Sequence, residues 1–333
     1  MKAKQLLLIL LAAFFLFASS TLALAGNKLY WSNETLVWDG VTRYYRIYIP
    51  PNLPANPALV IMLHATSTNA ADKPPTTINY GWQSFAEEYT FVLVQPASTY
   101  DTESGQWNWN AYYLDPAFAP GEAGTCTEPP ATGCPDDAGF LRELINTVTA
   151  QYNVDPTQVF VAGMSSGAMM AERVGVELSD LVAAIVPASG QIAGYPTLPI
   201  PNPNPPVAPV SVQEWHGTDD GVLQPCNNGP TLYSGYQVLM ATVDQTFDYW
   251  YQQNDCTTLE TTQTLCLNEK PNKGVTGNDA TGCTNDVEVQ FIWEENVGHS
   301  WQDKNVGARW EFFQSHPKQS APNTRQSTSS PAQ

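Results

Sequence analysis

The stretch "VFVAGMSSGAMMAERVGV", residues 159–176, decides the fold because its character changes abruptly at one serine. Residues 159–162 are a short apolar run of the kind found in buried strands. Residues 168–178 contain good helix formers with apolar side chains at helical spacing. The pattern G-x-S-x-G, centred on Ser165, lies between them, and its small residues let a strand turn tightly into a helix. The pattern indicates a nucleophilic serine at a strained turn, and a purely structural strand–turn–helix is the alternative.

Segments with strand and helix patterns alternate on both sides of this turn. Before it, strands are predicted at 43–49, 58–63 and 91–94, and helices at 79–90 and 138–152. We expect Asp136 or Asp137 to cap the second helix. After it, strands are predicted at 181–186, 209–215 and 287–293. The alternation predicts an α/β fold with a mostly parallel central sheet and helices on both faces. In such a sheet, functional groups lie on loops at the carboxyl ends of the strands.

The two ends of the chain have compositions unlike the middle. Lys2 and Lys4 precede an apolar run and the A-x-A pattern at residues 23–25, so residues 1–25 are predicted to be a secretory signal peptide. Residues 318–333 are rich in Ser, Thr and Pro and are predicted to be a disordered tail. We therefore expect a secreted protein with one catalytic domain at 26–317. No later run approaches the length of a membrane-spanning helix, so no membrane partner is expected.

Charge and cysteine content restrict the partners and cofactors. The net charge of -18 argues against nucleic acid and anionic lipid, and we expect a monomer. Six cysteines in an exported chain predict disulfides within loop insertions. Cys126 and Cys134 are the best pair because they share one loop, whereas the pairing of the other four is left open. No spacing typical of zinc ligands is present, so neither a metal nor another cofactor is expected.

A serine nucleophile needs a base to take its proton and an acid to orient that base. Of the four histidines, His299 follows the last predicted strand, within "ENVGHSW". His216, in "EWHGTDDGV", precedes two carboxylates. It is expected to support the loop that carries them, which is called the acid loop below. The order of nucleophile, acid and base along the chain is then Ser165, Asp219 or Asp220, and His299, which is the order used by folds with this strand–serine–helix turn.

Two further groups of residues complete the predicted site. The backbone amides of Ser166 and of Thr66, in the loop "LHATST", are the candidate donors to an oxyanion. Trp107, Trp109 and Trp301 are candidate exposed platforms for a flat or apolar substrate, and burial in the core is the alternative for each.

These motifs, taken in order, resemble one enzyme family. The stretches "LHATS", "GWQSFAEEYTFVLVQP", "DDAGFLRELINTVTAQYNVDPTQVFVAGMSSGAMMA", "WHGTDDGV" and "VGHSW" are similar to the secreted polyhydroxybutyrate depolymerases and feruloyl or acetylxylan esterases. The resemblance covers roughly residues 40–315. One departure is Ala65, where family members usually have Gly.

The resemblance implies an α/β-hydrolase that cleaves an ester or a polyester through an acyl-enzyme without a cofactor. The family pattern H-G-x-x-D implies Asp220, rather than Asp219, as the acid, with Ser165 and His299 as nucleophile and base. Two alternatives are kept. Oxidised polyvinyl alcohol hydrolases, which cleave β-diketones, resemble the same pattern, and a polymer-binding protein without catalysis would belong to a different functional class.

Overall fold

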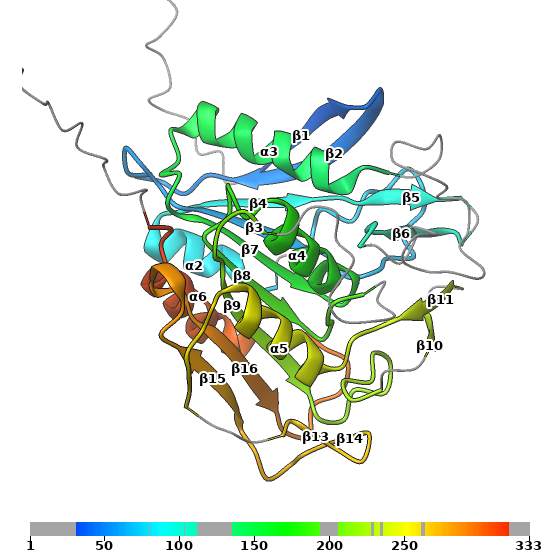
Figure 1. Cartoon of the computed structure of the whole chain (residues 1–333). Helices are drawn as coiled ribbons and strands as arrows, with labels where there is room; N and C mark the ends of the chain where they lie inside the picture. The colour runs from blue at the N-terminus through cyan, green and yellow to red at the C-terminus, as the bar shows by residue number, and fades with distance from the viewer. Residues whose placement is uncertain are drawn as a thin grey trace, which may run out of the picture.

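The computed structural model describes residues 31–78, 80–102, 104–111, 135–193, 206–227, 230–233, 236–260 and 264–319. Within these residues, ten strands form one sheet in the order β1-β2-β4-β3-β7-β8-β9-β16-β15-β12 (Figure 1). The neighbouring strands from β4 to β16 pair in parallel, and the strands at both edges pair antiparallel. The predicted α/β class with a mostly parallel central sheet is therefore confirmed.

The parallel strands are short and mostly buried, and they are predominantly apolar except for β9 and β16, which carry several polar residues. They are β3 (Leu59–Leu63), β4 (Val92–Pro96), β7 (Val159–Met164), β8 (Ala184–Ala188), β9 (Ser211–Gly217) and β16 (Val289–Glu294). The edge strands are β1 (Trp31–Trp38), β2 (Val41–Tyr48), β15 (Gly277–Thr281) and β12 (Thr258–Leu259). Three small hairpins add β5 (Thr99–Asp101) with β6 (Gln106–Asn108), β10 (Pro230–Tyr233) with β11 (Tyr236–Leu239), and β13 (Cys266–Leu267) with β14 (Lys270–Pro271).

Helices cover both faces of the sheet (Figure 1). One hydrophobic cluster joins the sheet to α3 (Asp137–Tyr152), α4 (Ser166–Glu177) and α5 (Val243–Gln253), and a second joins it to α2 (Trp82–Tyr89) and α6 (Val306–Ser315). β7 lies between the clusters, because Val159 and Val161 face the first while Phe160 and Ala162 face the second. This alternation explains why the strand is apolar at every position.

Several boundaries differ from the sequence prediction. The strand predicted at 181–186 lies at 184–188, because the chain after α4 is still turning at Leu181 and Val182, whose amides donate to Leu178 O. β1, α5 and α6 were not predicted. The side chain of Asp136 caps α3 by accepting from the Gly139 amide, whereas Asp137 forms a buried ion pair with Arg43 at 2.6 Å.

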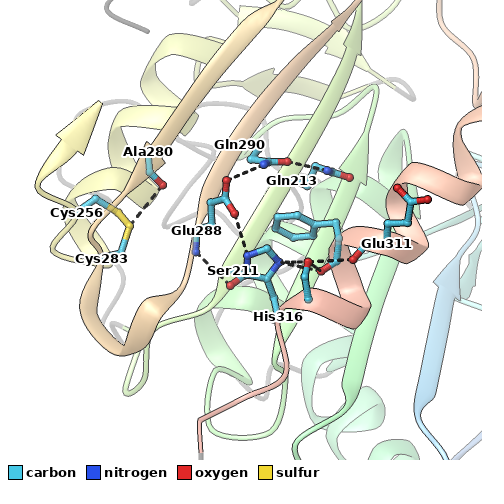
Figure 2. A network of polar contacts seen from close by, with 11 residues as sticks. Ser211, Gln213, Cys256, Ala280, Cys283, Glu288, Gln290, Glu311 and His316 are labelled. Atoms are coloured by element: carbon cyan, nitrogen blue, oxygen red, sulfur yellow. Dashed lines mark hydrogen bonds and ion pairs between the residues drawn. A yellow bond between two sulfur atoms is a disulfide. The ribbon is translucent and has the colours of Figure 1, made fainter. Parts of the chain in front are cut away.

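The end of α6 is fixed to the sheet by polar contacts (Figure 2). His316 Nε2 lies 3.0 Å from a carboxylate oxygen of Glu288, and the Glu288 amide donates to Ser211 Oγ. The first residue of the expected tail, Lys318, still contacts this domain, because its amide donates to Thr157 O and its ammonium to Ser179 O. The predicted signal peptide and nearly all of the expected tail lie outside the described residues. No helix in the described part of the chain is long and apolar enough to cross a bilayer.

Candidate active site

Ser165 lies between β7 and α4 in a strained backbone conformation, with φ 57° and ψ -118°. A non-glycine residue at positive φ costs on the order of 1–3 kcal/mol and persists only where its surroundings enforce it. The glycines of the motif show this enforcement. A Cβ on Gly163 would lie 2.0 Å from Gly167 O, and one on Gly167 would lie 2.3 Å from Leu63 O. Only glycine at both positions allows the turn to pass this close to its neighbours.

The structure brings together three side chains that are far apart in the sequence. His299 Nε2 lies 2.9 Å from Ser165 Oγ, and His299 Nδ1 lies 2.8 Å from Asp220 Oδ2. Ser165 follows β7, Asp220 follows β9 and His299 follows β16, so all three lie beyond the carboxyl ends of parallel strands. A continuous path of hydrogen bonds thus leads from a serine hydroxyl through an imidazole to a buried carboxylate, the arrangement that removes a proton from a serine during nucleophilic attack.

Polar contacts on both oxygens fix the carboxylate of Asp220. Oδ1 accepts from the amides of Val222 and Leu223 at 2.9 Å each, and Oδ2 faces His299 and His216. Burial alone raises the pKa of this carboxyl, but the bonds from His216 and His299 outweigh burial and hold the pKa of Asp220 below its ordinary value. The carboxylate is therefore ionised throughout the neutral pH range.

The neighbouring residues Asp219 and His216 differ in their surroundings. The side chain of Asp219 is half exposed and pairs with Lys273 at 2.7 Å, on the surface. His216 is fully buried, and its Nε2 lies 2.9 Å from Leu223 O and 3.2 Å from Asp220 Oδ2. His216 therefore contacts the acid loop, as expected, and does not reach the serine through any contact in the described structure.

The loops that carry Asp220 and His299 are joined by backbone contacts. The Thr218 amide donates to Glu294 O at 3.0 Å, and the Asp219 amide donates to Val297 O at 2.9 Å. A Cβ on Gly217 would lie 2.2 Å from Val297 O. The glycine of the "HGTDD" stretch is thus required for the two loops to lie in contact, a role that the sequence analysis did not assign.

The two predicted oxyanion donors come from segments that touch. Ser166 is the first residue of α4 and is fully buried, while Thr66 lies in the loop after β3. That loop packs on the first turn of α4 through the close approach of Gly167 to Leu63 O and His64 O. The Thr66 hydroxyl donates to Asn108 Oδ1 at 2.7 Å, which fixes its side chain.

The tryptophan expectation is partly wrong. Trp107 is 4% exposed and Trp109 is fully buried, so neither forms an exposed platform. Their indole nitrogens donate to Ala70 O and His64 O, respectively. Trp301 is half-buried, donates to Tyr80 O and stacks on the Arg309 guanidinium at 3.8 Å. For these two tryptophans the alternative, burial in the core, therefore holds.

Two disulfides lie in the insertion between the acid loop and β16. Cys226 pairs with Cys266. Cys256 pairs with Cys283, as Figure 2 shows. The predicted pair Cys126–Cys134 lies outside the described residues. Among the residues whose placement is described, no cluster of three or more His, Cys, Asp or Glu side chains is arranged to hold a metal ion.

Comparisons with known proteins agree with the resemblance seen in the motifs. Residues 43–200 match the family model described as Esterase PHB depolymerase. Feruloyl esterase B of Piromyces equi is 25% identical over 180 residues, covering 53% of this chain and 31% of the relative. Poly(3-hydroxybutyrate) depolymerase of Ralstonia pickettii is 30% identical over 179 residues, covering 51% and 33%. Acetylxylan esterase A of Aspergillus awamori is 30% identical over 155 residues, covering 44% and 42%. The chain thus spans less than half the length of each of these relatives.

Solved structures show the same fold. The acetyl xylan esterase from Aspergillus awamori superposes with a TM-score of 0.54 at 18% identity, covering 85% of this chain and 99% of that chain. A thermostable esterase superposes with a TM-score of 0.53 at 13% identity, covering 87% and 64%. The α/β-hydrolase fold predicted from the motifs is therefore confirmed, and the similar proteins are by name carboxylic ester hydrolases.

Proposed function

We propose that this protein is a serine esterase that cleaves carboxylic esters through a covalent acyl-enzyme. The observation that carries the proposal is the chain of contacts from Ser165 Oγ to His299 and on to Asp220, beside a serine held at positive φ. That geometry matches the needs of acyl transfer, in which a weak hydroxyl nucleophile must lose its proton as it attacks.

The proposed reaction has two halves. Ser165 Oγ attacks the ester carbonyl while His299 Nε2 takes its proton, and the amides of Ser166 and Thr66 donate to the developing oxyanion. The tetrahedral intermediate then expels the alcohol, which receives the proton from His299, and leaves an acyl group on Ser165. Water, deprotonated by His299, attacks this acyl group and releases the acid. Asp220 stays ionised and orients the imidazole throughout.

The proposed substrates are esters of the kinds named in the relatives: a hydroxyalkanoate polyester, a feruloyl ester or an acetyl ester. Trp301, as the half-buried tryptophan two residues after His299, is the remaining candidate for substrate contact. Secretion is also proposed, supported by the signal-like residues 1–25 and by the two disulfides.

A serine-directed fluorophosphonate probe tests the chemistry. Mass spectrometry of the labelled protein is expected to place the adduct on the Ser165 peptide, with hydrolysis of p-nitrophenyl butyrate lost in parallel. His299→Ala is expected to abolish both, whereas His316→Ala, at the far end of α6, serves as the matched control and is expected to retain both. Absence of both labelling and hydrolysis in folded protein would favour a polymer-binding protein instead.

One enzyme preparation then identifies the substrate class. Polyhydroxybutyrate film, methyl ferulate, acetylated xylan and a small β-diketone are compared by kcat/KM. Preference for the β-diketone would refute the esterase assignment while leaving the nucleophile in place. Secretion is checked separately, by finding Gly26 at the N-terminus of protein recovered from the medium.

A further inference from the structure

His64 directly follows β3 and is only 2% exposed, but it makes no contact with Ser165, Asp220 or His299 in the described structure. Its Nε2 lies 3.0 Å from the amide nitrogen of Ser98, and its Nδ1 lies 2.5 Å from Ala65 O. A backbone N–H can only donate, so Nε2 must be the nitrogen without hydrogen. Nδ1 then carries the hydrogen and donates it to the Ala65 carbonyl.

The Ala65 carbonyl belongs to the same peptide unit as the Thr66 N–H. That unit is planar, and in the trans form its carbonyl oxygen and amide hydrogen point in opposite directions. A hydrogen bond that holds the carbonyl on one side therefore holds the N–H on the other. The imidazole of His64 thus fixes the direction in which the Thr66 amide points, although it does not touch that amide.

The peptide units on either side are also held. The unit before it is held at both ends, because the Ala65 amide donates to the Tyr80 hydroxyl at 3.1 Å and His64 O accepts from the Trp109 indole at 2.9 Å. The unit after it is held by the Ser67 amide, which donates to Trp107 O at 3.1 Å. Both units that flank the Ala65–Thr66 peptide are therefore anchored to other partners, and His64 is the side chain that holds the unit between them.

The protonation state of His64 agrees with this arrangement. Burial, together with the charge of Arg43, lowers the pKa of His64 to about 4, against the raising effect of its bond to Ala65 O. The ring is therefore neutral near pH 7 and keeps one nitrogen free of hydrogen for the Ser98 amide. A charged ring would instead present a hydrogen to that N–H.

We propose that His64 is a positioning residue that directs the Thr66 amide at the oxyanion through its Nδ1–H bond to the Ala65 carbonyl. This inference rests on the proposed esterase function and adds a residue to it. A merely structural histidine would lower stability and all activities together, whereas a positioning histidine affects the step at which negative charge develops on the carbonyl oxygen.

Two substrates that differ only in the carbonyl atom, oxygen or sulfur, isolate the step at which negative charge develops on that atom. Sulfur accepts hydrogen bonds much more weakly than oxygen, so p-nitrophenyl thionoacetate gains less from an oxyanion donor than p-nitrophenyl acetate. The ratio of kcat/KM for the ester to that for the thionoester therefore reports donor alignment. Loss of one oxyanion donor costs about 10²–10³ in kcat, so misalignment is expected to lower the ratio at least ~10-fold.

Substitution of His64 by Asn or by Gln distinguishes the hydrogen bond made by Nδ1 from the one made by Nε2. In His64→Asn, the side-chain NH₂ can occupy the position of Nδ1 and still donate to Ala65 O, although the Ser98 amide loses its acceptor. In His64→Gln, the amide oxygen can occupy the position of Nε2 and accept from Ser98, but no donor faces Ala65 O. We expect the Asn variant to keep the wild-type ratio and the Gln variant to lower it, mainly through kcat with little change in KM.

Met62→Ala is the control for lost stability, because it truncates a buried β3 side chain, two residues before His64, in the cluster that joins the sheet to α2 and α6. It is expected to lower the melting temperature and leave the ratio unchanged. An unchanged ratio in folded His64→Gln, or a ratio lowered equally in both His64 variants, would overturn the proposal. If only the Asn variant folds, a lowered ester-to-thionoester ratio in that variant would by itself overturn the proposal. Full activity of Ser165→Ala would instead refute the esterase mechanism, whatever the His64 variants show.

Discussion

Replacing Asp220 by Asn should abolish most of the activity for a reason that can be followed atom by atom. Oδ1 of Asp220 accepts from two backbone amides, and Oδ2 faces His299 Nδ1 at 2.8 Å. An Asn carbonyl must stay with the two amides, because its NH₂ group would meet two donors there. The NH₂ group then faces His299 and donates to Nδ1.

That donation reverses the histidine tautomer. With Nδ1 as an acceptor, the hydrogen of the neutral ring moves to Nε2, which then points a proton at Ser165 Oγ and cannot take one. In a serine protease, the equivalent change lowers kcat about 10⁴-fold, which corresponds to about 5 kcal/mol of lost transition-state stabilisation at 1.36 kcal/mol per tenfold. We expect a loss of the same order for Asp220→Asn on p-nitrophenyl butyrate, with KM little changed.

Asp219→Asn is the matched control, one residue away. Its pair with Lys273 is half exposed on both sides, and such surface pairs contribute about 0–1 kcal/mol. Its kcat should therefore stay within about fivefold of wild type. A kcat above a tenth of wild type in Asp220→Asn, or a larger loss in Asp219→Asn, would show that the acid had been assigned to the wrong residue.

Four further predictions follow from other parts of the site and core. Ser165→Ala and His299→Ala should each lower kcat by at least ~10³, and the double variant should be hardly worse, because such residues act as a unit; multiplicative losses in a kinetic comparison would contradict this. Gly217→Ala should destabilise the protein by about 1–3 kcal/mol in urea titrations, because its Cβ meets Val297 O, whereas Gly221→Ala, which has open space, should not; equal effects would refute the packing argument. Burial raises the pKa of Glu172 to about 8, well above its ordinary 4.5, so the stability contribution of this protonated carboxyl is complete below about pH 4.5 and is lost as pH rises toward 8; Glu172→Gln should flatten the fall of Tm over that interval, and an unchanged slope in scanning fluorimetry would contradict the assignment. Reduction of the disulfides should lower activity on polyester film more than on a small p-nitrophenyl ester, with far-UV circular dichroism nearly native, because a domain of this size has sufficient core without them; collapse of the dichroism signal would show that the disulfides secure the fold itself.

The parts of the fold that local chemistry determines were predictable from the sequence. Buried parallel strands must be apolar on both faces, so β3, β4 and β7 stand out as continuous apolar runs. The turn at Ser165 was visible because the flanking positions tolerate only glycine. Since parallel strands place their carboxyl ends at one edge, the order Ser165, Asp220, His299 was enough to predict that these residues meet.

Residues whose role depends on contacts across the fold were not predictable in this way. Trp107 and Trp109 carry no local mark of burial, because the segments that cover them lie elsewhere in the chain. β1 was missed because only its pairing with β2 at the sheet edge makes it a strand, and its own residues are mostly half-buried or exposed. α6 was missed because its apolar residues do not keep to one face of the helix, so it shows little helical periodicity.

The loop after β3, which carries Thr66 and is called the oxyanion loop below, shows most clearly which contacts a sequence cannot predict. Tyr80 receives the Ala65 amide on its hydroxyl and the Trp301 indole on its carbonyl, so one residue joins the loop after β3 to the loop that carries His299. The two loops are more than 200 residues apart in the sequence, and Tyr80 lies at the far end of the first, just before α2. A residue that accepts from two donors in different loops has no sequence pattern of its own, because its constraint is the distance between those loops rather than the identity of its neighbours. Tyr80→Phe removes the bond to the Ala65 amide and keeps the carbonyl that Trp301 uses. It should therefore disturb the oxyanion loop without displacing His299, lowering the ester-to-thionoester ratio while the fluorophosphonate still labels Ser165, and complete loss of labelling in folded protein would refute this division of roles.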